Sequence, residues 1–155
     1  AEFDLLSTLD HPNIVKLYEI FFYKSNYYVV MEFCRGGTLI DLIRKNKNVS
    51  EKTMMPIMKQ LLSALAYLES KQIVHRDIKL DNIVVLGEED ENGDYSIKII
   101  DFGTAIRVSK KKSSSIAGTR YYMAPEAFKG VLHAKSDIWS SGVILYILFQ
   151  GKFPF

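Results

Sequence analysis

Three short motifs constrain this chain more than any other feature: HRDIKLDN at 75–82, DFG at 101–103 and APE at 124–126. One such run alone is weak support for a site, but three in this order and spacing are very hard to obtain by chance. The first two contain acids, a lysine and an amide. The oxygen atoms of the acids and the amide suit hard cations. Four side chains of these two motifs are the candidate site residues: Asp77, Lys79, Asn82 and Asp101.

The bulk composition is that of an ordinary soluble domain. The chain has 155 residues, the length of one domain, and its 48% apolar content allows a sizeable core. The net charge of +2 and one short basic run at 110–112 do not make the dense basic face of a nucleic-acid binder. The only cysteine, Cys34, cannot form an intrachain disulfide, which favours the cytosol or the nucleus. The longest apolar stretch, 142–149, is too short to cross a bilayer, so we expect neither nucleic acid nor membrane as a partner.

The first part of the chain predicts a helix, a hairpin and a capped helix. Apolar residues recur near helical spacing from the start until the stretch 10–13 ends the pattern. Apolar and aromatic runs at 14–22 and 27–33, separated by a short polar turn, predict an antiparallel hairpin. Thr38, with Asp41 three residues on, predicts the N-cap of a short helix.

The middle of the chain predicts a long helix and two short strands. The helical pattern covers 50–71, and Pro56 within it predicts either a kink or a helix that begins near Met55. The strands are expected at 83–86 and 96–100. The acidic loop between them superficially resembles a calcium-binding sequence, but its glycine is misplaced for an EF-hand, so we expect a solvated hairpin tip.

The last part predicts a polar loop followed by a buried helix. The stretch 104–119 is rich in Ser and Lys. Ser136 predicts the N-cap of a helix with its core at 138–149. Gly142 within that helix predicts the close approach of another backbone.

In their order and spacing the three motifs match the protein-kinase signature, and the chain resembles the catalytic domain of a serine/threonine protein kinase along essentially its whole length. The resemblance implies an α+β fold of two lobes, of which this chain would hold a truncated part. It implies an N-lobe remnant at 1–31 with one helix and two strands, a hinge at 32–37, and an incomplete, mainly helical C-lobe at 38–155. The glycine-rich loop and ATP-binding lysine that precede this region in kinases are not in the sequence.

The resemblance also implies transfer of the γ-phosphate of ATP, with Mg²⁺, to Ser or Thr hydroxyls of a protein substrate. Asp77 would receive or orient the acceptor proton, and Lys79 would neutralise the terminal phosphate. Asn82 and Asp101 would coordinate the metal. A lone loop Asp is more often a cap or surface charge, and a lone Asn a turn residue, but the motif reverses that preference. Lys79 at its place also distinguishes serine/threonine kinases from tyrosine kinases.

ATP binding would involve residues in both lobes. By the same resemblance the backbone groups of Glu32 and Cys34 would hydrogen-bond the adenine. Met31 would border the deep pocket, and Val84 would pack beneath the base. Met31 and Cys34 equally suit ordinary core packing. Glu2 matches the helix glutamate that pairs with the ATP-binding lysine, although a solvated helix residue is the plain alternative.

Several further residues gain a supporting role from the resemblance. Phe102 would stack with His75, Leu17 and Leu6, which are otherwise ordinary core residues. Thr119 would hold Asp77, Asp137 would anchor the backbone of the 75–82 loop, and 118–126 would dock the protein substrate. Arg76 suggests a cationic pocket for a phosphorylated segment; the candidate acceptors are Ser109, Ser113, Ser114 and Ser115, in what is equally well a plain flexible loop.

The stretches 9–14, 17–19 and 142–148 look most like calcium-dependent and calmodulin-dependent protein kinases. Thr38 departs from the glutamate that many of them carry there, although Asp81 offers another acid near the substrate. We expect a regulatory domain outside this chain and little transfer by the 155 residues alone. The alternatives are a non-catalytic kinase-like scaffold and, opposed by the docking loop, a small-molecule phosphotransferase.

Overall fold

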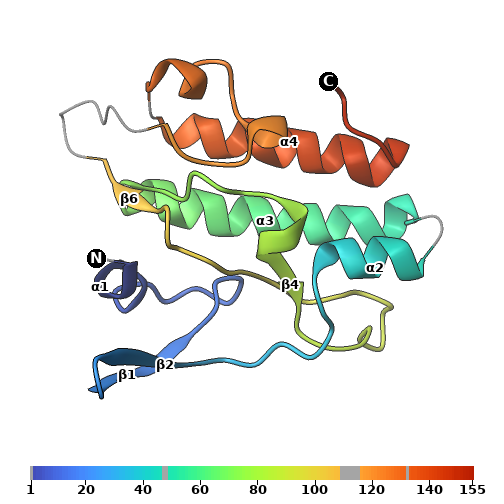
Figure 1. Cartoon of the computed structure of the whole chain (residues 1–155). Coiled ribbons are helices and arrows are strands. Elements are labelled where there is room, and N and C mark those ends of the chain that lie inside the picture. The colour runs from blue at the N-terminus through green and yellow to red at the C-terminus, as the bar shows by residue number, and fades with distance from the viewer. Residues whose placement is uncertain (1, 47–48, 109–115, 132) are drawn as a thin grey trace.

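The computed structural model describes residues 2–46, 49–108, 116–131 and 133–155. Two long helices lie side by side in the upper part of Figure 1, and a hairpin and a short helix lie at its left and lower left. The α+β class predicted from the sequence is confirmed. The elements, in order, are α1 Glu2–Leu6, β1 Leu17–Tyr23, β2 Asn26–Met31, α2 Leu39–Lys45, α3 Glu51–Ser70, β3 Ile73–Val74, η1 Leu80–Asn82, β4 Ile83–Val85, β5 Ile97–Ile99, β6 Ile106–Arg107, η2 Arg120–Tyr122, η3 Ala127–Lys129 and α4 Ala134–Gln150.

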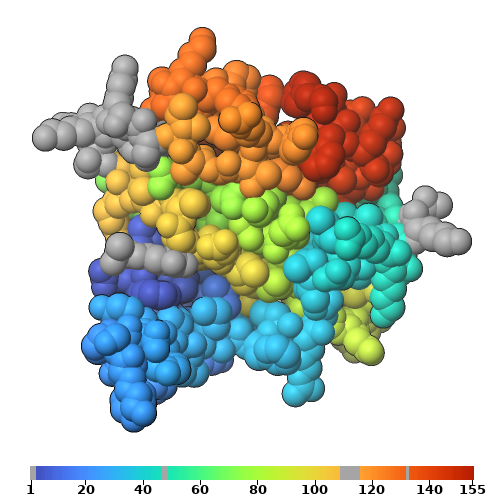
Figure 2. Space-filling model, in the orientation of Figure 1, coloured from blue at the N-terminus to red at the C-terminus, as the bar shows by residue number. Residues whose placement is uncertain are grey.

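The hairpin of β1 and β2 is antiparallel, as the sequence predicts, and Tyr23 pairs with Asn26 at its tip. Lys24 and Ser25 between them have φ values of 47° and 65°. Positive φ at both central residues is typical of a type I′ turn, whose twist matches that of the strands. The hairpin projects as the blue lower corner of the surface in Figure 2.

The short helices end or begin where local hydrogen bonds change. α1 ends at Leu6, earlier than the predicted end at 10–13. Thr38 caps α2 as predicted: its hydroxyl accepts from the Asp41 amide at 3.2 Å, and the Asp41 carboxylate accepts from the Thr38 amide at 2.9 Å. This reciprocal capping box satisfies two otherwise unpaired donors at the start of α2.

α3 begins at Glu51, with Ser50 as its N-cap, and Pro56 lies inside it. The predicted alternative of a start near Met55 is therefore wrong. A proline inside a helix costs about 3 kcal/mol, because one backbone hydrogen bond is lost. Burial of the apolar face offsets that cost, since the residues predicted for this face are all buried: Met54, Ile57, Met58, Leu61, Leu65 and Leu68.

α4 corrects two sequence-based predictions. Its N-cap is His133, whose Nδ1 accepts from the Lys135 amide at 3.1 Å, rather than Ser136. Ser136 lies in the first turn and donates instead to Glu126 Oε1 at 2.9 Å. No described backbone approaches Gly142, because a Cβ built there meets nothing within 4 Å. Gly142 is exposed, while the buried face of α4 is formed by residues such as Ile144 and Ile147.

β4 and β5 pair antiparallel, with Val84 opposite Lys98. The acidic loop between them closes on itself, because Asp90 Oδ1 accepts from the amides of Asn92 at 2.8 Å and Asp94 at 2.9 Å. Four of its acidic residues, 88–91, are exposed and Asp94 is half-buried, which confirms the solvated tip. No helix in the described part of the chain is long and apolar enough to span a bilayer.

Candidate active site

The loop 75–82 is held at its start by a buried carboxylate from α4. The His75 amide donates to Asp137 Oδ2 at 2.7 Å, and the Arg76 amide donates to Oδ1 at 3.0 Å. Asp137 is 3% exposed. Burial raises the pKa of Asp137, and the nearby His75 ring and the two amides oppose that rise. This contact confirms that Asp137 anchors the loop, and it ties residues far apart in sequence.

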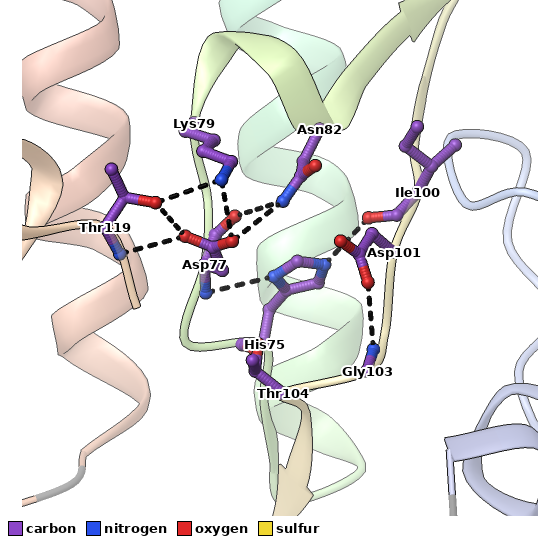
Figure 3. A network of polar contacts seen from close by, with 9 residues as sticks. All are labelled: His75, Asp77, Lys79, Asn82, Ile100, Asp101, Gly103, Thr104 and Thr119. Atoms are coloured by element: carbon purple, nitrogen blue, oxygen red, sulfur yellow. Dashed lines mark hydrogen bonds and ion pairs between the residues drawn. The ribbon is translucent and has the colours of Figure 1, made fainter. Parts of the chain in front are cut away.

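Asp77 lies at the centre of the polar network in Figure 3. Lys79 Nζ is 3.0 Å from Asp77 Oδ2, and Asn82 Nδ2 donates to the same oxygen at 3.2 Å. Asn82 Nδ2 also donates to the Asp77 carbonyl at 2.9 Å, which folds the loop back on itself. Lys79 and Asn82 thus meet at one carboxylate.

Thr119 completes the set of donors around Asp77. Its amide and its hydroxyl donate to Asp77 Oδ1 at 3.0 and 2.6 Å, and Lys79 Nζ donates to the Thr119 hydroxyl at 3.0 Å. The predicted contact between Thr119 and Asp77 is therefore confirmed. Burial alone would raise the pKa of Asp77, but the hydrogen bonds from Thr119 and Lys79 outweigh it and hold that pKa below its usual value. Asp77 is a fixed, ionised acceptor at neutral pH.

Asp101 lies on the other side of the His75 ring from Asp77 in Figure 3, and no polar contact joins it to the other three predicted residues in the described structure. Its φ of 59° turns the backbone sharply, and its Oδ1 accepts from the Gly103 amide at 3.2 Å. Asp101 is exposed. A non-glycine residue in this left-handed region carries strain of about 1–3 kcal/mol, and such strain clusters at functional sites.

His75 and Phe102 form the apolar floor of the site. Their rings meet edge to face with centroids 4.8 Å apart, and Phe102 is fully buried. Leu6 belongs to the same buried cluster and Leu17 packs against it, so the predicted stack lies within one core. Burial lowers the pKa of His75 and keeps the ring neutral. The ring Nε2 lies 3.0 Å from the Ile100 carbonyl, which links the 75–82 loop to the residue before Asp101.

Two supporting residues were missed in the sequence. The Thr104 hydroxyl donates to the His75 carbonyl at 3.0 Å, and Arg76 Nε donates to the Thr104 carbonyl. Gly118 has a φ of +118°, and a Cβ there would stand 2.3 Å from the Arg76 carbonyl oxygen. Only glycine allows that approach, and it places Thr119 against Asp77. The position of Gly118 directly before Thr119 was the available signal.

Comparison with known proteins finds the protein kinase domain over residues 1–155. The chain belongs to the protein kinase family. It is 47% identical over 152 residues to calcium-dependent protein kinase 5 of Plasmodium berghei (strain Anka), covering 97% of this chain and 26% of that protein. It is 44% identical over 156 residues to calcium-dependent protein kinase 6 of the same organism, covering 99% of this chain and 10% of that protein. The predicted resemblance to calcium-dependent kinases is confirmed, and the chain spans 26% or less of these relatives' length.

In this kinase chain the segment 32–37, predicted as the hinge, connects β2 to α2. Met31 ends β2 and is exposed, while Glu32 and Cys34 are half-buried. Among the described residues neither the Glu32 carbonyl nor the Cys34 amide makes a hydrogen bond within the chain. Val84 lies in β4 and forms a bridge with Thr38 at the far end of the segment. The backbone groups predicted to meet the adenine are thus unused.

The donor atoms of the site fit Mg²⁺. Asn82 uses its N–H groups on Asp77, which leaves its carbonyl oxygen, and Asp101 supplies a carboxylate. Mg²⁺ takes few protein oxygens and fills its shell with phosphates and water. The described residues contain no cluster of three or more His, Cys, Asp or Glu able to hold a metal.

Some predicted residues cannot be placed in this kinase. Glu2 begins α1, but its side chain lies outside the described residues. Ser109 and the serines at 113–115, the candidate phosphate acceptors, also lie outside them. Glu126, the last residue of the APE motif, accepts from the Ser136 hydroxyl in the described part of the chain.

Proposed function

We propose that the full-length protein is a serine/threonine protein kinase and that this chain carries its catalytic residues. The observation that supports this best is the convergence of Lys79, Asn82 and Thr119 on Asp77, with Asp101 on the other side of the His75 ring. Phosphoryl transfer needs charge compensation and an oriented acceptor more than covalent chemistry. A fixed carboxylate next to an ammonium and two oxygen ligands supplies both.

Asp77 is the acceptor-orienting group in this proposal. Its carboxylate has about four lone-pair directions, and Thr119, Lys79 and Asn82 already occupy them. A substrate hydroxyl therefore displaces one donor when it binds to Asp77. Lys79 is the donor that can leave Asp77, because its three N–H groups can bind a phosphate instead while Thr119 remains hydrogen-bonded to Asp77.

Asn82 and Asp101 would hold Mg²⁺, which bridges and neutralises the phosphates of ATP when bound. The hinge would receive the adenine through the backbone of Glu32 and Cys34, between Met31 and Val84. Glu2 would meet the lysine of a preceding strand. The division into N-lobe residues 1–31, hinge 32–37 and C-lobe 38–155 belongs to the same proposal.

Specificity for Ser and Thr is inferred from Lys79, which distinguishes these kinases from tyrosine kinases. The loop 118–126, whose Thr119 touches Asp77, would dock a protein substrate. A regulatory domain would lie elsewhere in the full-length protein, which we place in the cytosol or the nucleus. The relatives are named calcium-dependent, and for this protein calcium control would appear as a difference in activity between Ca²⁺ and a chelator.

The test uses the full-length protein, Mg²⁺-ATP and three degenerate peptide libraries that differ only in a Ser, Thr or Tyr acceptor. We expect phosphate on the Ser and Thr libraries and none on the Tyr library. Transfer to Tyr would contradict the acceptor specificity. ATP binding without any transfer, with and without Ca²⁺, would favour a non-catalytic scaffold.

A further inference from the structure

Lys98 is a strand lysine that points inward to the protein rather than into solvent. Its side chain is only 11% exposed, although lysines are mostly exposed. Lys98 Nζ lies 2.9 Å from Glu32 Oε2 and donates to the Pro12 carbonyl at 2.9 Å. One ammonium therefore joins β5, the loop before β1 and the first residue of the hinge.

The hinge 32–37 is tied to the β4–β5 sheet at both ends. At its start, the Glu32 carboxylate bonds to Lys98 of β5, and the Lys16 amide donates to the same oxygen at 3.2 Å. At its end, the Gly36 amide donates to the Val85 carbonyl at 3.0 Å, and the Val85 amide donates to the Gly37 carbonyl at 2.8 Å. The second tie is backbone pairing. At the start, the Glu32 amide also donates to the Lys16 carbonyl at 2.9 Å, and the direct link from the hinge to β5 is the Glu32–Lys98 pair.

The register of the sheet connects this pair to the proposed nucleotide site. Lys98 is the partner of Val84, the residue proposed to pack beneath the base. Partners across an antiparallel pair project from the same face of the sheet. Between the two ties lies Cys34, whose amide is unused among the described residues. The length of the Lys98 side chain thus sets how far Glu32 stands from the strand that carries Val84.

We propose that Lys98 is a positioning residue that holds the hinge over Val84, and so sets the affinity for ATP, through its ion pair with Glu32. The inference rests on the proposed kinase function but concerns a residue outside the transfer chemistry. The pair is largely removed from water, with Glu32 20% exposed, so it is screened less than a surface pair. Without Lys98 the Glu32 carboxylate loses its counter-ion and its direct link to β5, so the start of the hinge is held only by its described contacts with Lys16.

The experiment measures steady-state kinetics of the full-length protein with Lys98→Met, which keeps the length of the side chain and removes its charge. We expect KM for ATP to rise about three- to tenfold, with a much smaller change in kcat and in KM for the peptide. Lys98→Arg should recover most of the affinity. Lys52→Met is the matched control, because Lys52 is an exposed lysine of α3 with no described polar contact.

A second variant covers the case in which Lys98→Met does not fold. Glu32→Gln removes the same ion pair and keeps the hinge backbone, so it should raise KM for ATP by a similar factor. The double variant should then be no worse than either single one. Additive effects, or an unchanged KM in a folded single variant, would overturn the role of Lys98.

Amide hydrogen exchange gives a readout that does not need activity. We expect the peptide that contains 32–36 to exchange faster in Lys98→Met than in the parent, while peptides from α3 are unchanged. If the parent protein binds no ATP, the kinase proposal fails. Hydrogen exchange still shows whether Lys98 holds the hinge in place. Equal exchange of 32–36 in both proteins would mean that Lys98 does not hold it.

Discussion

The loop 75–82 and the β1–β2 hairpin are both short, but they are held in different ways. The loop is held by side chains from elsewhere, including Asp137 of α4 and Thr119. The hairpin is held mainly by its own ladder and by aromatic pairs such as Phe21 and Tyr28, stacked 5.2 Å apart at its surface. The loop therefore depends on the whole fold for its geometry, while the hairpin depends on its local sequence. Four substitutions and one pH experiment can break or sharpen this contrast.

Asp77→Asn should have the largest effect. The amide cannot accept a proton, so transfer should fall about 10²–10⁴-fold while ATP binding is largely kept. Peptide phosphorylation and nucleotide titration of the full-length protein would measure the two effects separately. Turnover equal to that of the parent would remove Asp77 from its proposed role.

Asp137→Ala should destabilise the protein by about 3 kcal/mol, because it leaves the buried amides of His75 and Arg76 without their acceptor. Urea unfolding would give the change in free energy. Asp137→Asn is the control: it keeps one carbonyl oxygen and should cost less than the alanine variant. An alanine variant as stable as the parent would show that other groups anchor the loop.

Gly118→Ala should lower kcat about 10–100-fold, since a methyl group 2.3 Å from the Arg76 carbonyl must push Thr119 away from Asp77. Gly142→Ala is a matched control, because its Cβ meets nothing within 4 Å in the described structure. That control should keep the activity of the parent and gain up to about 1 kcal/mol of helix stability. Equal kcat for the two alanine variants would refute the positioning role of Gly118.

Phe21→Ala should cost about 1 kcal/mol or less, because its ring is half exposed and its main loss is one cross-strand pair. Phe102→Ala, at the fully buried ring beneath the loop, should cost about 3–5 kcal/mol. Thermal or urea unfolding of both variants would compare the two regions directly. Similar costs would mean that the hairpin is as tightly integrated as the core.

The smallest effect concerns pH. The folded-state pKa of Asp77 lies below its usual value, so its hydrogen bonds stabilise the fold above the unfolded pKa of about 3.9. That contribution is lost as the pH falls through the lower folded pKa. The free energy of unfolding should therefore fall less steeply in Asp77→Asn than in the parent below about pH 4. Phe21→Ala should keep the slope of the parent, and identical slopes for Asp77→Asn would contradict the assignment.

Turns and caps that depend on contacts between residues close in sequence were predictable from the sequence. The hairpin turn at Lys24 and Ser25 and the capping box of Thr38 and Asp41 involve neighbours along the chain, so residue type and spacing were sufficient. The four site residues could be named because they belong to short motifs. Their meeting point could be named only through the resemblance to kinases.

Predictions that depended on packing between segments far apart in sequence were less accurate. Pro56 was expected either to kink α3 or to delay its start to near Met55, and the later start is wrong because burial of the apolar face of α3 outweighs the lost hydrogen bond. Serine is a good N-cap residue by type. The Ser136 hydroxyl, however, donates to Glu126, and His133 caps α4 instead. Gly142 suggested a crowded helix face, and the structure leaves that position open.

The sequence by itself determined the helices, the turns and the identity of the charged groups at the site, since these follow from local spacing and residue chemistry. Only the tertiary structure decided which groups face one another: Asp137 under the loop, Thr119 against Asp77, and Lys98 against Glu32. The physical reason is that a buried charge is stable only beside its partner, and the packing of distant segments chooses that partner.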